Sequence, residues 1–156
     1  CHKVAEDAYK AVPNSFEANH LMWWDGNNDM TRTKYLFEAA RIAPNDNRAF
    51  DDLMIIYEIT GDQQKFDEMC QKIYESLELP ASILNWGYNV LSELEPNAIV
   101  FVYGDNDTYS LWITQSVKKF RKDVTIVNTS LMQMEEYRTR IFKDLGYSNF
   151  YWHYAV

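Results

Sequence analysis

Hydrophobic and polar positions alternate with a helical period through the first half of the chain. Short polar segments containing Pro, Gly, Asn or Asp separate the periodic stretches, as turn residues do between helices. The pattern predicts a short helix over residues 3–12, helical hairpins over 14–43 and 47–77, and a further helix over 81–94. We therefore expect the N-terminal part of the chain to be helical.

The two predicted hairpins match each other when one is shifted by about 34 residues, a period typical of tetratricopeptide repeats. The matched positions are Phe16 with Phe50, Trp23 with Tyr57, Leu36 with Cys70, and Ala39 with Ile73. The segments EAARIAPND and YEITGDQQKF also resemble parts of that repeat. Residues 13–78 are therefore similar to the tetratricopeptide family, a resemblance that implies a surface for contact with another protein.

A different pattern begins after Pro96. The run AIVFVYG (98–104) is β-branched and aromatic throughout, which predicts a strand buried on both faces. A helix is expected from about Tyr109, and DVTIVNTS (123–130) predicts a second strand. Because a helix connects them, we expect the two strands to be parallel, with a right-handed crossover.

The pattern after the second strand predicts one more helix and a final apolar segment. Residues 132–145 have helical spacing, and Gly146 is placed to end that helix. The stretch SNFYWHYAV (148–156) predicts a third strand or an aromatic tail. The expected fold is α/β, with N-terminal tetratricopeptide-like α-hairpins packed against a small parallel β-α-β-α-(β) Rossmann-like sheet. Its two regions are predicted over 1–80 and 81–156.

Four polar residues follow the first predicted strand directly, at the sheet edge where open α/β folds usually bind ligands. Carboxylates, amides and hydroxyls near a Trp suit a polar ligand such as a sugar. The predicted ligand-binding residues are Asp105, Asn106, Asp107, Thr108, Trp112, Asn128 and Ser130.

Two other interpretations of this acidic turn stay open. Asp107 or Thr108 can cap the following helix, which is a purely structural role. The turn also resembles the Asp-x-Asp-x-Thr motif of haloacid dehalogenases, but its Thr comes one position early, and the later Lys and Asp pair is missing. An enzyme acting on a glycan or phosphate through Asp105 or Asp107 is thus the alternative, and we assign no catalytic residue.

Composition limits the possible partners. The net charge of −8 argues against nucleic acid, which needs Lys and Arg to neutralise phosphates, and against direct adsorption to an anionic membrane. A hydrophobic content of 47% over 156 residues supports a buried core. No Cys or His spacing indicates a metal, and no motif indicates a cofactor. We expect neither.

The first residue, Cys1, carries a further expectation. Bacterial lipoproteins are cleaved immediately before a Cys that then receives lipid, so this start resembles a mature lipoprotein, although a fragment could begin in the same way. The resemblance predicts a lipid on Cys1 and an outer-membrane lipoprotein facing the periplasm or the cell surface. A lipid would provide the membrane attachment that the acidic surface does not.

The run NAIVFVYGDNDTYSLWITQSVKKFRKDVTIVNTSLMQMEEY resembles a soluble segment of multi-spanning bacterial membrane proteins. That family is common in Bacteroidetes and is related to protein O-mannosyltransferases. The matching positions are Gly104–Thr108, Leu111, Trp112, Gln115, Asp123, Val124, Val127, Asn128, Ser130 and Leu131. The resemblance implies an extracytoplasmic accessory module, since glycosyl transfer would belong to the membrane-embedded part. We therefore expect a cell-envelope interaction or scaffolding protein that binds an envelope membrane protein.

Overall fold

A computed structural model describes residues 2–26 and 29–147. The chain divides into two compact units, Cys1–Ile55 and Ile56–Val156.

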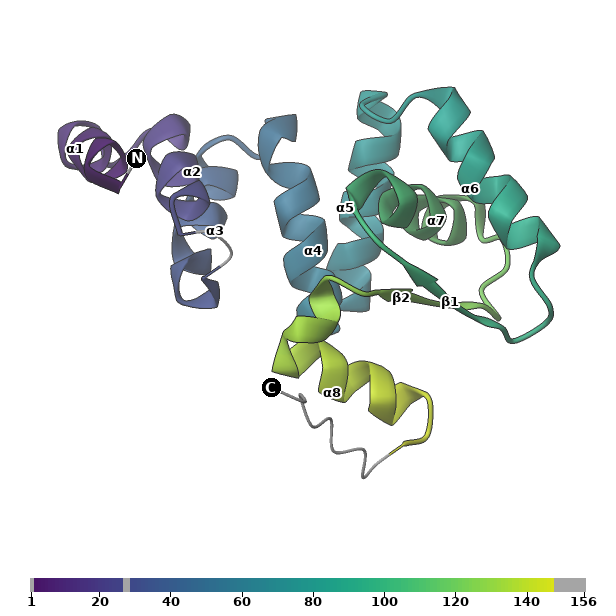
Figure 1. Cartoon of the computed structure of the whole chain (residues 1–156). Coiled ribbons are helices and arrows are strands. Elements are labelled where there is room, and N and C mark those ends of the chain that lie inside the picture. The colour runs from purple at the N-terminus through teal and green to yellow at the C-terminus, as the bar shows by residue number, and fades with distance from the viewer. Residues whose placement is uncertain (1, 27–28, 148–156) are drawn as a thin grey trace. The chain divides into compact units, whose positions relative to one another are not determined.

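Helices make up the first unit (Figure 1). They are α1 (His2–Ala11), α2 (Phe16–Trp24), the 3-10 turn η1 (Met30–Arg32) with α3 (Thr33–Ile42), and η2 (Asn47–Ala49), which leads into α4 (Phe50–Thr60). α2 and α3 pack against each other as a helical hairpin. Polar side chains cap the N-termini of α2 and η1. Ser15 accepts a hydrogen bond from the backbone N–H of Ala18 at 3.2 Å, and Asp29 accepts one from the backbone N–H of Thr31 at 2.9 Å. The predicted helical hairpin is confirmed.

The hairpin buries the aromatic and small residues that recur in the sequence. Phe16 is 4% exposed, Trp23 is 3% exposed, and Leu36 and Ala39 are fully buried. Each large apolar side chain removed from water in this way stabilises the unit by about 1.5–3 kcal/mol. The repeat pattern therefore marks the core of the unit.

The second unit contains a parallel pair of strands with helices around it. Its elements after the end of α4 are α5 (Gln63–Ser76), α6 (Ala81–Glu93), β1 (Ile99–Val102), α7 (Asp105–Lys118), β2 (Thr125–Asn128), η3 (Leu131–Gln133) and α8 (Glu135–Asp144). The strands pair from Ile99 with Thr125 to Val102 with Asn128. α7 connects them and packs on both α5 and α6 (Figure 1). The predicted β-α-β order and parallel pairing are confirmed.

One glycine allows α6 to lie unusually close to α7. A Cβ atom at Gly87, in the middle of α6, would stand 2.8 Å from the backbone carbonyl carbon of Ser110. Carbon atoms normally keep about 3.5–4.0 Å apart. Any side chain at this position would therefore push the two helices apart.

The expectation that the first strand is buried on both faces is wrong. Ile99 is 41% exposed and Phe101 is 65% exposed, whereas Ile126 and Val127 on β2 are 5% and 1% exposed. The reason is the width of the sheet, because only β2 pairs with β1 among the described residues, and the other edge of β1 stays open. The third strand predicted at 148–156 lies outside the described residues, so a Rossmann-like sheet stays a prediction.

The helices also extend the second unit beyond the region predicted as α/β. α5 belongs to the second predicted repeat, yet it packs directly on α7. The second predicted hairpin thus contributes to the same unit as the strands, whereas the sequence pattern placed a boundary after residue 80.

Candidate functional site

The segment predicted as an acidic turn is the first turn of a helix, which corrects the sequence interpretation. Gly104, at φ 86°, turns the chain sharply, and α7 begins at Asp105 instead of near Tyr109. No side chain caps this first turn; the Thr108 hydroxyl donates to the Gly104 carbonyl at 2.7 Å. Asp105, Asn106 and Asp107 are exposed. Their negative charges are favoured at this position by the helix dipole.

The predicted residues at the strand ends form a closed hydrogen-bond network. The amide nitrogen of Asn128 donates to the Thr108 hydroxyl at 3.1 Å. Its amide oxygen accepts from the backbone N–H groups of Ser130 at 2.9 Å and Leu131 at 3.1 Å. Thr108 is fully buried and Asn128 is 5% exposed. These side chains therefore hold β2 to α7, and their role in binding a ligand stays a prediction.

Tyr137 on α8 completes this network from the outer side of β2. The backbone N–H of Asn128 donates to the Tyr137 phenol oxygen at 3.0 Å. Burial raises the pKa of Tyr137 to about 12, so the phenol is neutral at physiological pH.

Trp112, the remaining predicted ligand residue, does not join the acidic residues. It is 4% exposed, and its ring meets Phe66 edge-on, with 5.5 Å between the ring centroids. It lines a separate cleft in the same unit. Cys1, the predicted lipidation site, lies outside the described residues.

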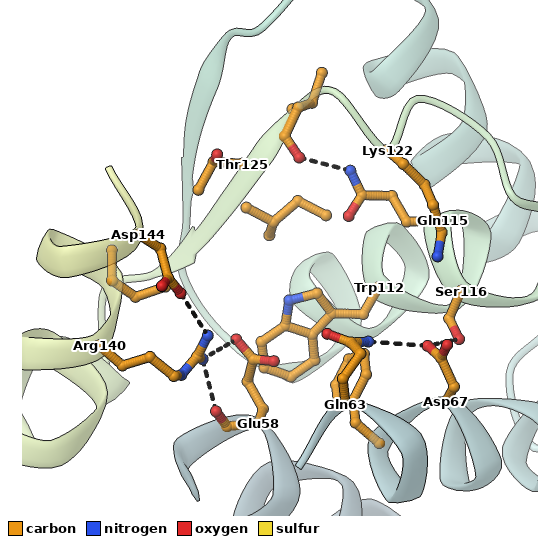
Figure 2. Close-up of a pocket in the computed structure, with 14 residues that line it drawn as sticks. Glu58, Gln63, Asp67, Trp112, Gln115, Ser116, Lys122, Thr125, Arg140 and Asp144 are labelled. Atoms are coloured by element: carbon orange, nitrogen blue, oxygen red, sulfur yellow. Dashed lines mark hydrogen bonds and ion pairs between the residues drawn. The ribbon is translucent and has the colours of Figure 1, made fainter. Parts of the chain in front are cut away.

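The sequence did not predict that cleft, which is drawn in Figure 2. Its volume is about 350 Å³, and its walls come from the end of α4 and from α5, α7, β2 and α8. The lining residues are Glu58, Gln63, Phe66, Asp67, Trp112, Gln115, Ser116, Lys122, Val124, Thr125, Ile126, Arg140, Ile141 and Asp144. They lie far apart in the sequence, and no single motif contains them all.

One wall of the cleft carries a partly buried ion pair. Arg140 donates to the Glu58 carboxylate and to the Glu58 backbone carbonyl, each at 2.6 Å. The side chains of Glu58 and Arg140 are 12% and 26% exposed. Burial raises the pKa of Glu58, against the attraction of Arg140. Arg140 therefore compensates the negative charge of Glu58, and it also lies 3.4 Å from the carboxylate of the exposed Asp144.

Asp67 forms a second polar group on the opposite wall. It accepts hydrogen bonds from the Ser116 hydroxyl at 2.5 Å and from the Gln63 amide at 3.0 Å, and Lys119 lies 3.6 Å away. Although burial acts in the opposite direction, these hydrogen bonds and the positive charge lower the pKa of Asp67. This carboxylate is also satisfied by its neighbours.

Arg140 Nε, on the wall formed by α8, is buried and has no hydrogen-bond partner within the described part of the chain. No hydrogen bond is described for the indole nitrogen of Trp112, the amide oxygen of Gln115 or the hydroxyl of Thr125 either. Figure 2 shows the indole nitrogen on the side of the ring that faces β2. Gln115 is held in place because its amide nitrogen donates to the carbonyls of Arg121 at 2.7 Å and Val124 at 2.8 Å. The cleft thus offers a fixed donor and a fixed acceptor.

The described residues contain no group of three or more His, Cys, Asp or Glu side chains that could hold a metal ion. Within 2–26 and 29–147, no helix combines the length and the apolar character that a bilayer-spanning helix requires. The chain therefore combines two kinds of structure: helical hairpins come first in the sequence, and a parallel β-α-β unit follows them.

Residues 83–144 match the family model described as TMEM260-associated domain 2. The matched stretch runs from within α6 to the end of α8 and thus contains both strands. No curated protein and no solved structure matches the chain. The match supports a link between this part of the chain and a TMEM260-like membrane protein family, in agreement with the expected membrane-protein association.

The motif that carries the resemblance has structural roles throughout the matched stretch. Besides the Thr108–Asn128 and Gln115 contacts, Asp123 accepts from the Asn97 backbone N–H at 3.0 Å and from Arg121 at 2.9 Å. These two hydrogen bonds hold the pKa of Asp123 well below its usual range, and the hydrogen bond from Arg121 has the larger effect. The side chains of the motif thus form hydrogen bonds that connect the loops, the strands and α7.

Proposed function

We propose that the chain is a non-catalytic binding module that contacts a TMEM260-like membrane protein. The match over 83–144 supports this choice of partner. We further propose that the chain has a scaffolding role in a bacterial cell envelope of the Bacteroidetes type, with an outer-membrane lipid anchor on Cys1. An enzyme using Asp105 or Asp107 is the alternative.

The observation that carries the proposal is the open edge of β1. The carbonyls of Ala98 and Val102 accept from the backbone N–H groups of Thr125 and Thr129 on the β2 side, each at 2.9 Å. Because successive residues of a strand alternate in direction, the backbone groups of Ile99 and Phe101 point away from β2. These groups have no partner among the described residues.

The side chains at this edge are apolar and exposed. Ile99 is 41%, Phe101 65% and Tyr103 76% exposed. An exposed apolar edge strand is a template for pairing with another strand, and added strands gain affinity from main-chain hydrogen bonds and specificity from alternate side chains. We therefore assign the β1 edge as the contact for an extended segment of the partner.

The test is co-purification of the chain with a TMEM260-like membrane protein from native membranes. Phe101→Lys places a charge on the edge and should abolish co-purification. Trp24→Lys is the matched control, because Trp24 is also 65% exposed but lies on α2 in the other unit. It should leave co-purification unchanged, as should the exposed Asp105→Asn change at the alternative enzyme site.

Three outcomes would contradict the assignment. Failure of the unaltered chain to co-purify with the membrane protein would reject the partner. Loss with Trp24→Lys alone would move the contact to the helical hairpins, where the repeat resemblance placed it. Unchanged co-purification of Phe101→Lys would reject the β1 edge.

A further inference from the structure

We infer that the cleft between α5, α7, β2 and α8 binds a small, uncharged ligand with several hydroxyl groups, such as a hexose. This site is separate from the β1 edge and does not depend on the proposed partner. None of the residues at that edge lines the cleft.

The size of the cleft limits the ligand. At about 350 Å³ the cleft is at the lower end of the range of pockets that hold small molecules. It combines an apolar floor, which includes Phe66, Trp112 and Ile126, with polar walls. This is the usual composition of a small-molecule site, where a few fixed polar groups orient the ligand.

The charges of the cleft favour a neutral ligand. Glu58 is paired with Arg140 at 2.6 Å, and Asp67 is bonded to Ser116 at 2.5 Å with Lys119 nearby. Lys122 also lines the cleft, and its positive charge acts on Asp67, so the acidic and basic side chains of the cleft balance each other. A charged ligand would disturb this balance and leave a partly buried charge uncompensated, which is strongly unfavourable. A neutral ligand leaves the balance in place.

The unpartnered atoms indicate hydroxyl groups. Trp112 is 4% exposed, yet its indole N–H has no acceptor in the described chain, and its nitrogen lies on the side of the ring toward β2 (Figure 2). Gln115, on the same helix, presents a free acceptor, since its two described hydrogen bonds are both made by the amide nitrogen. A hydroxyl both donates and accepts, so one polyhydroxylated molecule can satisfy Trp112, Gln115 and Thr125 together.

The experiment follows the indole N–H signal of Trp112 by nitrogen-15 NMR of the whole chain, with D-glucose, D-galactose and D-mannose as probes. Trp112→Phe identifies the signal and removes the donor. At least one sugar should shift the signal in a saturable way. Thr125→Val keeps the β-branched shape but removes the hydroxyl, and it should weaken the binding roughly fivefold to tenfold.

Two controls separate this inference from the proposed function. Trp86→Phe alters a 41% exposed Trp on α6 outside the cleft and should leave sugar binding unchanged. Phe101→Lys should also leave it unchanged, even though that variant disrupts the β1 edge. The inference is overturned if no sugar shifts the Trp112 signal. It is equally overturned if inorganic phosphate shifts the signal while the sugars do not.

Discussion

Replacement of Gly87 by Ala tests the close packing of α6 on α7, two helices that contribute to the matched stretch 83–144. The added methyl would lie 2.8 Å from the carbonyl carbon and hydroxyl of Ser110 and 2.9 Å from its Cβ. At least one of these neighbours is backbone, so rotation of the Ser110 side chain cannot relieve the clash. The helices must separate, or the methyl must remain compressed.

The expected size of the effect is the difference between two opposing contributions. Overpacking a buried contact destabilises a protein by about 1–3 kcal/mol. Ala in place of Gly in a helix gains about 0.5–1 kcal/mol. We therefore expect Gly87→Ala to lower the free energy of unfolding by roughly 1–2 kcal/mol.

Urea unfolding followed by circular dichroism measures this difference, and Asn89→Ala is the matched control. Asn89 lies two residues further along the same helix and is exposed, so its replacement gains helix propensity without a clash. It should leave the unfolding free energy unchanged or raise it by up to about 0.5 kcal/mol. If Gly87→Ala were as stable as Asn89→Ala, the close approach of the two helices would be refuted.

Three further predictions concern other buried groups. Tyr137→Phe removes the only acceptor described for the Asn128 backbone N–H and should cost about 1–2 kcal/mol in urea unfolding; an unchanged midpoint would contradict the network. Arg121→Lys should lower the urea midpoint, because a single ammonium cannot reach the carbonyls of Leu91, Leu94 and Glu95 that Arg121 holds at 2.6–2.9 Å. Arg41→Lys, at a pair whose Arg is 71% exposed, should leave the midpoint unchanged. Cys70 is fully buried, and burial raises the pKa of its thiol to about 12. Iodoacetamide should therefore leave Cys70 unmodified in the native protein and modify it in urea, as measured by mass spectrometry of its peptide. Equal labelling under both conditions would argue against this burial.

The helices could be predicted from the sequence because their signals are local. Apolar residues at helical spacing and Asp, Pro or Gly at the ends fixed their ranges to within a few residues, as for α5, with Asp62 at its start. The parallel order of the strands followed from the helix between them. These inferences need no knowledge of distant contacts.

The surface of β1 and the cleft could not be predicted in this way. A run of β-branched and aromatic residues indicates a strand, but whether Phe101 is covered depends on how many strands pair with it. The cleft brings together Glu58, Asp67 and Arg140 from three helices, and nothing in their local sequence relates them. The start of α7 was misplaced because polar residues such as Asp105 favour both turns and first helical turns.

Hydrogen–deuterium exchange of the chain, alone and bound to a TMEM260-like membrane protein, shows whether a strand of the partner pairs with β1. The backbone amides of Ile99 and Phe101 have no partner in the described chain and should exchange rapidly in the free protein. Binding should protect the amides of Ile99 and Phe101, because an added strand would pair with them. Rapid exchange at these amides in the bound protein, with protection confined to other segments, would contradict it.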